Sequence, residues 1–543
     1  MLLFAVLFFI SFQNFGSRFG SIGADAETSL PPAPLGRNGV QLILGQKGVH
    51  YLTSKIAENL LENRLKEAKF SDFRRQILMF DVFLTNLRVY SMEKPRKNQY
   101  ETELQTSTNK IYFKAKNLRL TLQGDLSMKH QFFPKFFDPS TSSSRVYLAI
   151  NGLTLDLSMT MFKGHNGYPK LVVDGCRANV RSLSADQFSP KMFQQAMKNR
   201  QARFIVQSMV CQNLATMVEN LLPSIFKRQP LILHMTRIFP KMLRSLSMLP
   251  GGLKAGSLAW QLDKIIRKSS LDLRLTAQPE FRTSDAKKAS DSPIALFFLK
   301  GDILWKNGIN GALEAGETPF RATKIPFRAP GTKMAYLSIS DHVINSLFYQ
   351  AYKNGALKMT IDSKKDLQPT ANIFLNSFLS LEEDDSKDSN ASSRLIDLSA
   401  FHCPALRINR KSIDLFADFY LTISNFNRQV RKTILKVLIN FEAEVKFEIL
   451  TSNNINQSIN INLKMNKVTG ALIETTIEKF DQNRADQVAD IIATLIQGVI
   501  NEKMAKQGGL SLPKMNFIQF SNIDLELNDR FLTMGADFEA KLI

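Results

Sequence analysis

The sequence predicts an α+β fold built from two similar halves, and three observations support this prediction. Several segments alternate apolar and polar residues with a period of two, among them Leu118–Leu122 and Leu153–Leu157, as antiparallel strands with one buried face do. Two long segments, 189–222 and 484–507, repeat apolar residues at helical spacing instead. The order strand, short helix, strands, long helix, strands occurs twice along the chain, which indicates an internal duplication.

Length and composition describe a globular chain of several domains. With 543 residues, it is too long for one hydrophobic core and has room for about two to four domains. A hydrophobic content of 44% is ordinary for such chains. The 40 Phe residues suit β-sheet cores, and they would also suit a cavity that holds acyl chains.

The N-terminus predicts secretion. Met1–Ile10 is an apolar run too short to span a bilayer, and small residues near Gly23 and Ala24 offer a cleavage site, as in a signal peptide. No later run reaches the roughly 18 apolar residues of a membrane helix. We therefore expect a secreted, extracellular protein, in which Asn390 and Asn456 are glycosylation acceptors within Asn-X-Ser sequons.

The three cysteines fit an oxidising compartment. Cys176 precedes the long helical segment and Cys211 lies within it, so we expect a bridge that ties a strand to a helix and leaves Cys403 over. Closing a loop of about 35 residues would stabilise the fold by roughly 3–4 kcal/mol. The sequence contains no CxxC motif and no His/Cys cluster, so no metal site is predicted.

The charge balance points to anionic partners. The formal net charge is +21, from 70 basic and 49 acidic residues, which favours lipid headgroups, lipopolysaccharide or heparin-like sugars. A basic surface that only aids solubility is the alternative. Nucleic-acid binding has nothing but net charge in its favour and is not expected.

The first half begins with a strand and a helix. Residues 39–44 alternate like a strand, and 46–66 carry an apolar helical stripe opposite mixed charges, which favours packing on a sheet over lying on a membrane. A meander of strands follows between 77 and 157. The long helix then has Ser189 as its N-cap and Pro190 as its first residue, and it ends at Leu222. Apolar residues at helical spacing continue in the basic stretch 227–258, as in a membrane-contacting segment or a buried connector.

A turn between two of these strands is rich in Phe and basic residues. Rings among headgroups and ammonium groups near phosphates are what anchoring at a membrane interface requires; the alternative is that the rings fold back onto the sheet. The residues of this expected membrane tip are Lys129, His130, Phe132, Phe133, Lys135, Phe136 and Phe137.

The second half repeats the plan. A strand that ends at Asp341 leads into a short helix through Ala351 that ends near Gly355. The clearest later strand is Ile459–Met465, and a long helix over 484–507 follows. The last strands are expected at 523–527 and 531–538.

Six features that occur in the same order resemble one family. They are the segments 46–51, 334–341, 355–359, 510–513 and 531–537 and the pair Cys176 and Cys211. In these features the chain is similar to the lipid-transfer and lipopolysaccharide-binding family, which includes bactericidal/permeability-increasing protein, lipopolysaccharide-binding protein, phospholipid transfer protein and cholesteryl ester transfer protein. The resemblance covers nearly the whole mature chain.

This resemblance implies a boomerang of two pseudo-symmetric barrels, each a twisted antiparallel sheet wrapped around long helices, joined by a central β-sheet. The expected divisions are a signal peptide over 1–24, an N-terminal lipid-binding barrel over 38–245, a linker with the central strands over 246–330, and a C-terminal lipid-binding barrel over 331–543.

The resemblance also implies an apolar pocket for acyl chains in each barrel, although helix periodicity alone would make the same residues ordinary core. The N-terminal pocket residues are Val49, Leu52, Ile56, Leu60, Leu214, Val218 and Leu221. The C-terminal pocket residues are Ile344, Leu347, Phe348, Val488, Ile492, Leu495 and Val499.

The sequence departs from the family at the tip. Bactericidal members carry a dense basic cluster there, whereas this tip has two Lys and one His among Phe residues, with Arg74 and Arg75 as expected neighbours. At about 1 kcal/mol per basic residue near an anionic surface, this favours membrane docking over tight phosphate capture. The stretch 260–316 is also longer than the family's connector.

We therefore expect a secreted lipid-binding and lipid-transfer protein that carries phospholipid as its ligand, needs no cofactor and docks on membranes or lipoprotein particles. The alternative is a lipopolysaccharide-binding antimicrobial or pattern-recognition protein of innate immunity. A hydrolase is not expected, because the sequence has no GxSxG or HExxH motif and its six His show no paired spacing with Asp or Glu.

Overall fold

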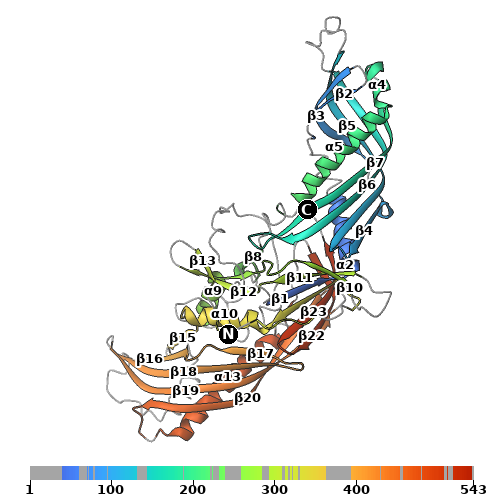
Figure 1. The fold of residues 1–543 in the computed structure, drawn as a ribbon. Coiled ribbons are helices and arrows are strands. Elements are labelled where there is room, and N and C mark those ends of the chain that lie inside the picture. The colour runs from blue at the N-terminus through green and yellow to red at the C-terminus, as the bar shows by residue number, and fades with distance from the viewer. Residues whose placement is uncertain are drawn as a thin grey trace.

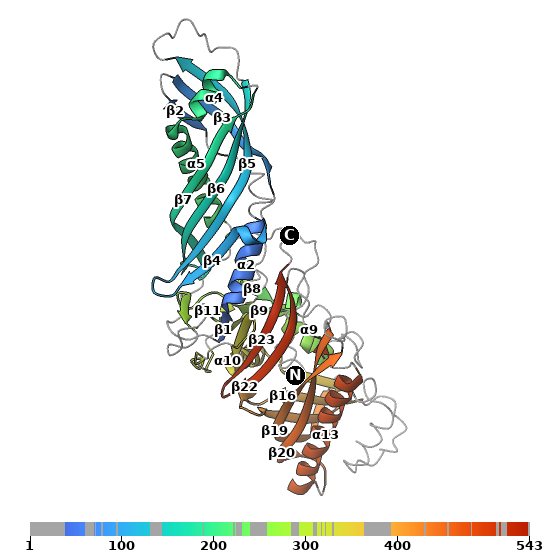
Figure 2. The same cartoon turned by 90° about the vertical axis from the view of Figure 1, so that its right-hand side faces the viewer.

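The structure, a computed structural model, describes most of the chain after residue 38. The described residues are 39–59, 70, 72–77, 80–93, 96–130, 144–187, 189–220, 223, 231–238, 258–283, 293–307, 312–315, 318–320, 322–327, 331–362, 393–427, 430–452, 456–478, 480–506, 510–511 and 518–540. They form an elongated molecule with a sheet at each end and a sheet between them (Figures 1 and 2).

The N-terminal sheet is antiparallel throughout and has six strands. Its order is β2-β3-β5-β6-β7, and β4 pairs with β5 outside this path. Its strands are β2 (Phe73–Ile77), β3 (Phe80–Met92), β4 (Tyr100–Gln105), β5 (Lys110–His130), β6 (Ser144–Lys163) and β7 (Pro169–Ala185). A short 3-10 helix, η3 (Lys97–Gln99), precedes β4. The strands expected at 118–122 and 153–157 are confirmed within β5 and β6.

The C-terminal sheet repeats this pattern with seven strands. Its order is β15-β16-β18-β19-β20-β21, and β17 pairs with β18 outside the path, as β4 pairs with β5. Its strands are β15 (Lys358–Asp362), β16 (Ser393–Ala400), β17 (Ala405–Ile408), β18 (Ile413–Asn427), β19 (Val430–Ser452), β20 (Asn456–Thr475) and β21 (Leu510–Ser511). The strand expected at 459–465 is confirmed within β20.

The central sheet takes strands from both ends of the chain and from its middle. Its order is β10-β11-β1-β14-β23-β22. The strands are β10 (Glu280–Thr283), β11 (Pro293–Leu299), β1 (Val40–Leu44), β14 (Ala335–Ser340), β23 (Phe531–Ala540) and β22 (Ile518–Asn528). The divisions 38–245, 246–330 and 331–543 stay a prediction, but each of these ranges contributes strands to this sheet, so the central strands are not confined to 246–330.

The described elements confirm an α+β fold with an internal repeat. The first strands of the two halves, β1 and β14, lie side by side at the centre of the central sheet. The two end sheets are open rather than closed barrels, since among the described residues β2 does not pair with β7, nor β15 with β20. A helix lies along the β7 edge, and another lies along the β20 edge except at Ser458 and Ile459, where the two-residue strand β21 pairs with β20.

Among the described residues, five helices accompany the three large sheets. They are α2 (Gln46–Asn59), α4 (Lys191–Met197), α5 (Arg200–Glu219), α10 (Asp341–Lys353) and α13 (Gln482–Lys506). The helices expected near 341–355 and 484–507 are confirmed as α10 and α13. Of the helix expected over 46–66, residues 46–59 are helical and 60–66 lie outside the described residues.

The prediction of a single helix over 189–222 is wrong, because the chain forms two helices there. Helix α4 ends at Met197, and the side chain of Asn199 accepts a hydrogen bond from the Gln201 amide at 3.2 Å, which caps a new helix. The expected N-cap is wrong as well: Pro190 occupies that position, and the Ser189 hydroxyl bonds to Asp186 instead.

A fourth, smaller sheet accounts for the long stretch between the halves. Its order is β13-β12-β9-β8, formed by β13 (Ala312–Ala315), β12 (Asp302–Asn307), β9 (Ser269–Asp272) and β8 (Ile232–His234). Two helices, α7 (Met235–Ile238) and α9 (Leu258–Lys268), accompany it. Helical spacing was expected to continue through this stretch. Residues 232–234 instead form a strand, because β8 pairs with β9, whereas 235–238 are helical as α7. Residues 239–257 lie outside the described residues.

Residues 272–281, which we call the junction strap, join the N-terminal sheet to the central sheet. The Leu275 amide donates to the Gly167 carbonyl at 2.8 Å in the turn between β6 and β7. Asn109, in the turn between β4 and β5, donates to the Pro279 carbonyl at 3.1 Å and accepts from the Phe281 amide at 2.7 Å. The N-terminal sheet is therefore held at two of its turns.

Buried charges fix the start of the strap. The Asp272 carboxylate is fully buried and accepts two hydrogen bonds from the Arg274 guanidinium, at 2.9 and 2.7 Å, while Lys300 Nζ lies 3.3 Å away. Burial alone would raise the pKa of Asp272, but the hydrogen bonds and charge of Arg274, with the charge of Lys300, hold it below its ordinary value of 3.8.

Replacing Asp272 with Asn should destabilise the fold by about 3–5 kcal/mol at neutral pH, because it removes the buried negative charge that lies between the Arg274 guanidinium and the Lys300 ammonium. The pKa of Asp272 is lower in the folded than in the unfolded chain, so its stabilisation is fully present above the unfolded value and is lost as the pH falls through the folded value. Urea unfolding from pH 7 to pH 2 should show the two proteins converging in acid. Asp263→Asn removes an exposed helical pair with Arg267 and should cost less than about 1 kcal/mol; equal losses in the two variants would contradict this account.

Helix α13 crosses β20 at Gly470 with no room for a side chain. A Cβ there would lie 2.3 Å from the Ala485 carbonyl oxygen, whereas a Cβ at Gly498, within α13 itself, would meet nothing within 4 Å. We expect Gly470→Ala to destabilise the chain by about 1–3 kcal/mol. Gly498→Ala should instead stabilise it by roughly 0.5–1 kcal/mol, because Ala favours helices. Urea unfolding of both variants measures these changes. If Gly470→Ala left the free energy of unfolding unchanged, α13 would not contact β20 closely at this position.

Candidate functional site

In the N-terminal half, an apolar face of two helices lies against the sheet. Helices α4 and α5 lie against this sheet (Figure 1). Their side chains pack with inward side chains of β3, β5, β6 and β7 in one continuous cluster, which we call the N-terminal core. The α5 residues that face it are Ala202, Val206, Met209, Val210 and Leu214. Phe204 is two residues away from both Ala202 and Val206 and therefore lies on the other side of the helix, where it is 70% exposed. Helix α5 is thus amphipathic by position, with one face on the sheet.

One disulfide and one hydrogen bond attach α5 to the edge strand β7. Cys176 and Cys211 form a disulfide with their Cα atoms 5.6 Å apart, which confirms the bridge expected between strand and helix. At the end of the helix, Glu219 accepts a hydrogen bond from the Val173 amide at 3.2 Å. The helix therefore covers the edge of the sheet and holds it at two points.

The C-terminal half attaches its long helix to its edge strand in another way. Side chains of α13 bond to the backbone of β20: Asp486 accepts from the Gly470 amide, Gln497 from the Met465 amide and Asn501 from the Leu463 amide, each at 2.9 Å. Asn501 also donates to the Leu463 carbonyl at 2.9 Å. The helix thus supplies the hydrogen bonds that a further strand would make.

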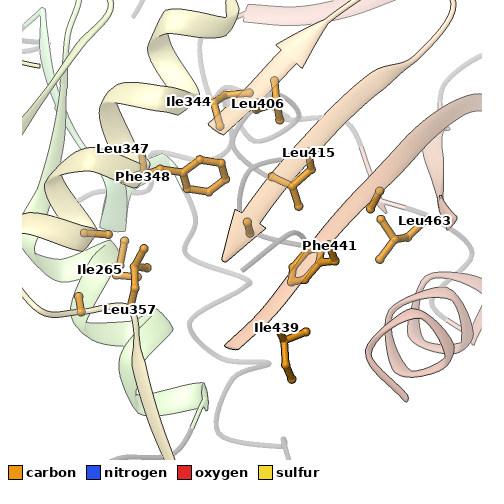
Figure 3. Packing of buried hydrophobic residues seen from close by; sticks show 14 of the residues in the cluster. Ile265, Ile344, Leu347, Phe348, Leu357, Leu406, Leu415, Ile439, Phe441 and Leu463 are labelled. Atoms are coloured by element: carbon orange, nitrogen blue, oxygen red, sulfur yellow. The ribbon is translucent and has the colours of Figure 1, made fainter. Parts of the chain in front are cut away.

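The short helix α10 is buried on nearly all sides. Ile344, Leu347 and Phe348 belong to a large cluster, the C-terminal core, together with side chains of the C-terminal sheet, of α13 and of the fourth sheet. Figure 3 shows the Phe348 ring pointing from α10 toward the strand that carries Leu415, with Ile344 beside Leu406. Some polar side chains of α10 bond to the strands packed against it. Asn345, for example, donates to the Leu406 carbonyl at 2.9 Å and accepts from its amide at 2.7 Å.

The structure brings some of the predicted N-terminal pocket residues together and separates others. Val49 of α2 and Val218 of α5 lie in one small cluster at the inner end of the N-terminal unit, beside Phe281 and Ala295. Leu214 belongs to the N-terminal core, whereas Leu52 is half-buried on the central sheet beside Phe538. The side chain of Ile56 and residues Leu60 and Leu221 lie outside what the structure describes. As a single pocket this set stays a prediction.

The C-terminal pocket set is more coherent. Ile344, Leu347, Phe348 and Val488 are buried in the C-terminal core, and Ile492 packs against it from α13. Leu495 and Val499 are on the same helix, but their side chains are outside the described part. All seven stay predictions as lipid contacts.

Most residues of the predicted membrane tip lie outside the described part of the chain. Lys129 and His130 are the last residues of β5, so the predicted tip begins where that strand ends. The side chains of these two residues are outside the described part. The same is true of the whole residues Phe132, Phe133, Lys135, Phe136 and Phe137. Arg74 on β2 is exposed, and its guanidinium lies 4.7 Å from the centre of the Phe83 ring; the side chain of Arg75 is not described. Asn390 is outside the described part, and Asn456 is the first residue of β20.

The remaining cysteine, Cys403, has an unreactive thiol. Cys403 is free and packs against the C-terminal core, and burial raises the pKa of its thiol to about 12. At neutral pH it is therefore protonated and a poor nucleophile.

Two further features of the described ranges concern membranes and metals. No helix in them is both long and apolar enough to cross a membrane. They also contain no group of three or more His, Cys, Asp or Glu residues arranged to hold a metal ion.

Sequence reasoning missed the residues that fasten α13 to β20. Asp486, Gln497 and Asn501 lie on one side of the helix, next to its apolar stripe. A row of amide and carboxylate side chains at helical spacing was the available signal, but such a row is also typical of a solvent-exposed face.

Comparisons with known proteins place part of the sequence in a family. Residues 280–540 match the sequence model described as "LBP / BPI / CETP family, C-terminal domain". A search of curated proteins found no match. Among solved structures, the chain is similar to a lipopolysaccharide binding protein, at 14% identity and a TM-score of 0.44 over 93% of this chain and 100% of that one. It is also similar to P47 of Clostridium botulinum E1, at 10% identity and a TM-score of 0.24 over 93% and 100%, and to Takeout 1 of Epiphyas postvittana, at 13% identity and a TM-score of 0.17 over 34% and 80%.

Removing the disulfide with Cys176→Ser and Cys211→Ser should loosen the N-terminal half first. The loss should be about 3–4 kcal/mol, since a bridge of this span restrains the unfolded chain. Hydrogen exchange should therefore speed up in peptides from β7 and α5 before those from β20 and α13, which are held by hydrogen bonds instead. Cys403→Ser is the matched control and should leave both halves unchanged. Simultaneous loosening of both halves would contradict independent attachment.

Proposed function

We propose that this chain, which belongs to the LBP/BPI/CETP family through the match of residues 280–540 to the family's C-terminal domain, is a secreted protein that binds and transfers phospholipid. Family membership supports lipid binding or transfer in general. Our proposal adds the ligand class and the place: acyl chains lie between the long helix and the sheet in each half.

The repeated packing of a helix on a sheet edge is the observation that carries this proposal. In both halves a long helix lies along the edge strand and turns an apolar face toward the sheet. Its attachment is concentrated at the edge, through the disulfide in one half and through side-chain hydrogen bonds in the other. A helix that is attached only to the edge strand can move away from the other strands while it stays attached. Such a movement would be required to admit an acyl chain between the helix and the sheet.

The energetics need no covalent chemistry. Burial of an acyl chain contributes about 0.8 kcal/mol per CH₂, so an enclosed chain leaves slowly unless a membrane receives it. Transfer then requires docking, for which we propose the Phe- and Lys-containing segment after β5. Rings would enter the headgroup layer while ammonium groups meet phosphates.

A second candidate is recognition of lipopolysaccharide, and the net charge of +21 favours it. The two functions differ in how they depend on salt, because exposed charges more than about 8 Å apart are screened at physiological ionic strength. Binding that depends on charge should weaken steeply between low and high salt, whereas acyl-chain retention should not.

Solvent extraction of the purified protein, followed by lipid mass spectrometry, tests the proposal. We expect phospholipid to co-purify and to survive a high-salt wash. Absence of bound phospholipid would contradict lipid carriage, and binding to lipopolysaccharide that disappears in salt, with nothing retained, would favour the second candidate.

A matched pair of variants on α5 locates the ligand. Val206→Phe enlarges an inward side chain of the N-terminal core, while Phe204→Ala trims an outward one. We expect the first to lower bound phospholipid to about half at a cost in stability of roughly 1–3 kcal/mol, and the second to change neither. Equal retention in both would place the lipid elsewhere.

A further inference from the structure

The helix pair α4 and α5 carries basic side chains and no acidic ones. No Asp or Glu occurs over residues 187–218, whereas Lys191, Lys198, Arg200 and Arg203 all lie there. The first three of these side chains are exposed, and the side chain of Arg203 is half-buried. We call these four residues the basic face of the helix pair. The inward side of the helices packs in the N-terminal core, so the basic face is left over from that packing.

The positive charge of the basic face is not offset within the described part of the chain. None of its four side chains forms an ion pair with another described residue. Exposed cations on the strands of the same half do have such partners: Lys114 Nζ lies 3.3 Å from Asp156, and Lys116 Nζ lies 2.8 Å from Glu101. The basic face is therefore a local source of positive potential, which attracts anionic partners.

Helix stability does not explain these cations. Arg200 and Arg203 lie in the first turn of α5, and neither α4 nor α5 has an acidic residue in its first turn. The positive end of the helix dipole lies there and disfavours basic side chains. What holds α5 in place is its apolar side, its disulfide and its Asn199 cap. The cations therefore need a reason outside the fold.

An exposed aromatic ring lies among these cations. Phe204 follows Arg203 directly and is four residues, or about one helical turn, after Arg200, so Phe204 and Arg200 share a side of the helix. At 70% exposure, Phe204 is the most exposed large apolar side chain in the described part of the chain. A phenyl ring has no polar atom that water can satisfy, so its exposure is unfavourable unless a partner covers it.

We propose that the basic face and Phe204 together dock on an anionic lipid surface. Phe204 enters the headgroup layer, while Lys198, Arg200 and Arg203 meet the lipid phosphates, as basic and aromatic side chains do at membrane interfaces. A soluble polyanion such as a sulfated glycan would use the charges and leave the ring in water. The basic face is separate from the segment after β5, so the protein has a second docking surface.

The place of this surface on α5 suits the proposed lipid transfer, on which this step rests. The contacts that attach α5 to β7 lie at Cys211 and Glu219, in the second half of the helix. Arg200 and Phe204 lie in its first half, which neither contact holds. Docking would thus bring to the membrane the end of the helix that is freer to move away from the sheet and admit an acyl chain.

Binding of the full chain to vesicles, measured by sedimentation, tests the charges. The vesicles contain phosphatidylcholine, either alone or mixed with phosphatidylserine. One variant neutralises three cations of the helix pair: Lys198→Gln, Arg200→Gln and Arg203→Gln. Its matched control removes the same charge from exposed residues of the C-terminal half: Arg407→Gln, Arg410→Gln and Lys411→Gln.

We expect the helix variant to bind the anionic vesicles about thirtyfold more weakly or worse, because each basic residue near an anionic surface contributes about fivefold. The control should lose only a small part of its affinity, since its cations lie far from the docked surface. Equal losses in the two variants, or none in the first, would overturn the proposal. So would loss of heparin binding in the helix variant with vesicle affinity unchanged.

Tryptophan fluorescence tests the ring. Phe204→Trp should shift its emission to shorter wavelength when anionic vesicles are added, after subtraction of the signal of Trp260 and Trp305 in the unsubstituted chain. The control is Phe416→Trp, at an exposed ring of the C-terminal sheet, and its emission should stay unchanged. No shift at position 204, or the same shift in both variants, would contradict insertion. Phe204 contributes to docking and not to holding a lipid, so retained phospholipid is a separate readout, and failure here is distinguishable from failure of lipid carriage.

Discussion

The pairing of β1 with β14 is the interaction on which the two-unit architecture depends. These strands open the two halves of the chain, and they pair antiparallel from Val40 opposite Ile339 to Leu44 opposite Ala335. Each leads into a short helix, α2 or α10, and then into its own end sheet. Because the pair is antiparallel, the two halves leave the central sheet in opposite directions, as Figure 2 shows. The later strands β11 and β23 flank the pair on either side and complete the sheet.

This arrangement leaves each end sheet with an open edge that must be covered. Exposed strand edges invite pairing with other chains, and the protein covers its two edges with helices that are attached differently. In the first half a disulfide fixes α5 to β7; in the second, side chains such as Asn501 bond directly to the backbone of β20. A covalent attachment needs an oxidising environment, so the N-terminal unit alone depends on the redox state. The two units can therefore share a fold and still differ in how firmly the long helix is held to its sheet.

Much of the fold could be predicted from periodicity, because strands with one buried face alternate and amphipathic helices repeat every three to four residues. The duplication was visible for the same reason, and the disulfide followed from the positions of Cys176 and Cys211. The break at Asn199 was not predicted, because the apolar stripe continues across it and only the capping side chain interrupts the helix. The short strand β8 was mistaken for helix because pairing with β9, far along the chain, decides its conformation.

The candidate sites were predictable to a lesser extent. Buried apolar residues such as Leu347 and Val488 can be found from their spacing, but spacing does not separate a core contact from a lipid contact. A row of polar side chains on the central sheet could not be predicted at all. Gln41, Ser338 and the β22–β23 hairpin that carries Glu526 and Thr533 are three distant segments, and only the register of the sheet brings them into line.

The central claim is that acyl chains lie between the long helices and their sheets. It is tested most directly by a phospholipid carrying a photoreactive diazirine in its acyl chain, loaded into the protein and cross-linked, with the modified residues mapped by mass spectrometry. Our account predicts cross-links on the inward faces of α5 and α13 and on the strands that face them. Cross-links confined to outward-facing residues such as Phe204 would contradict it.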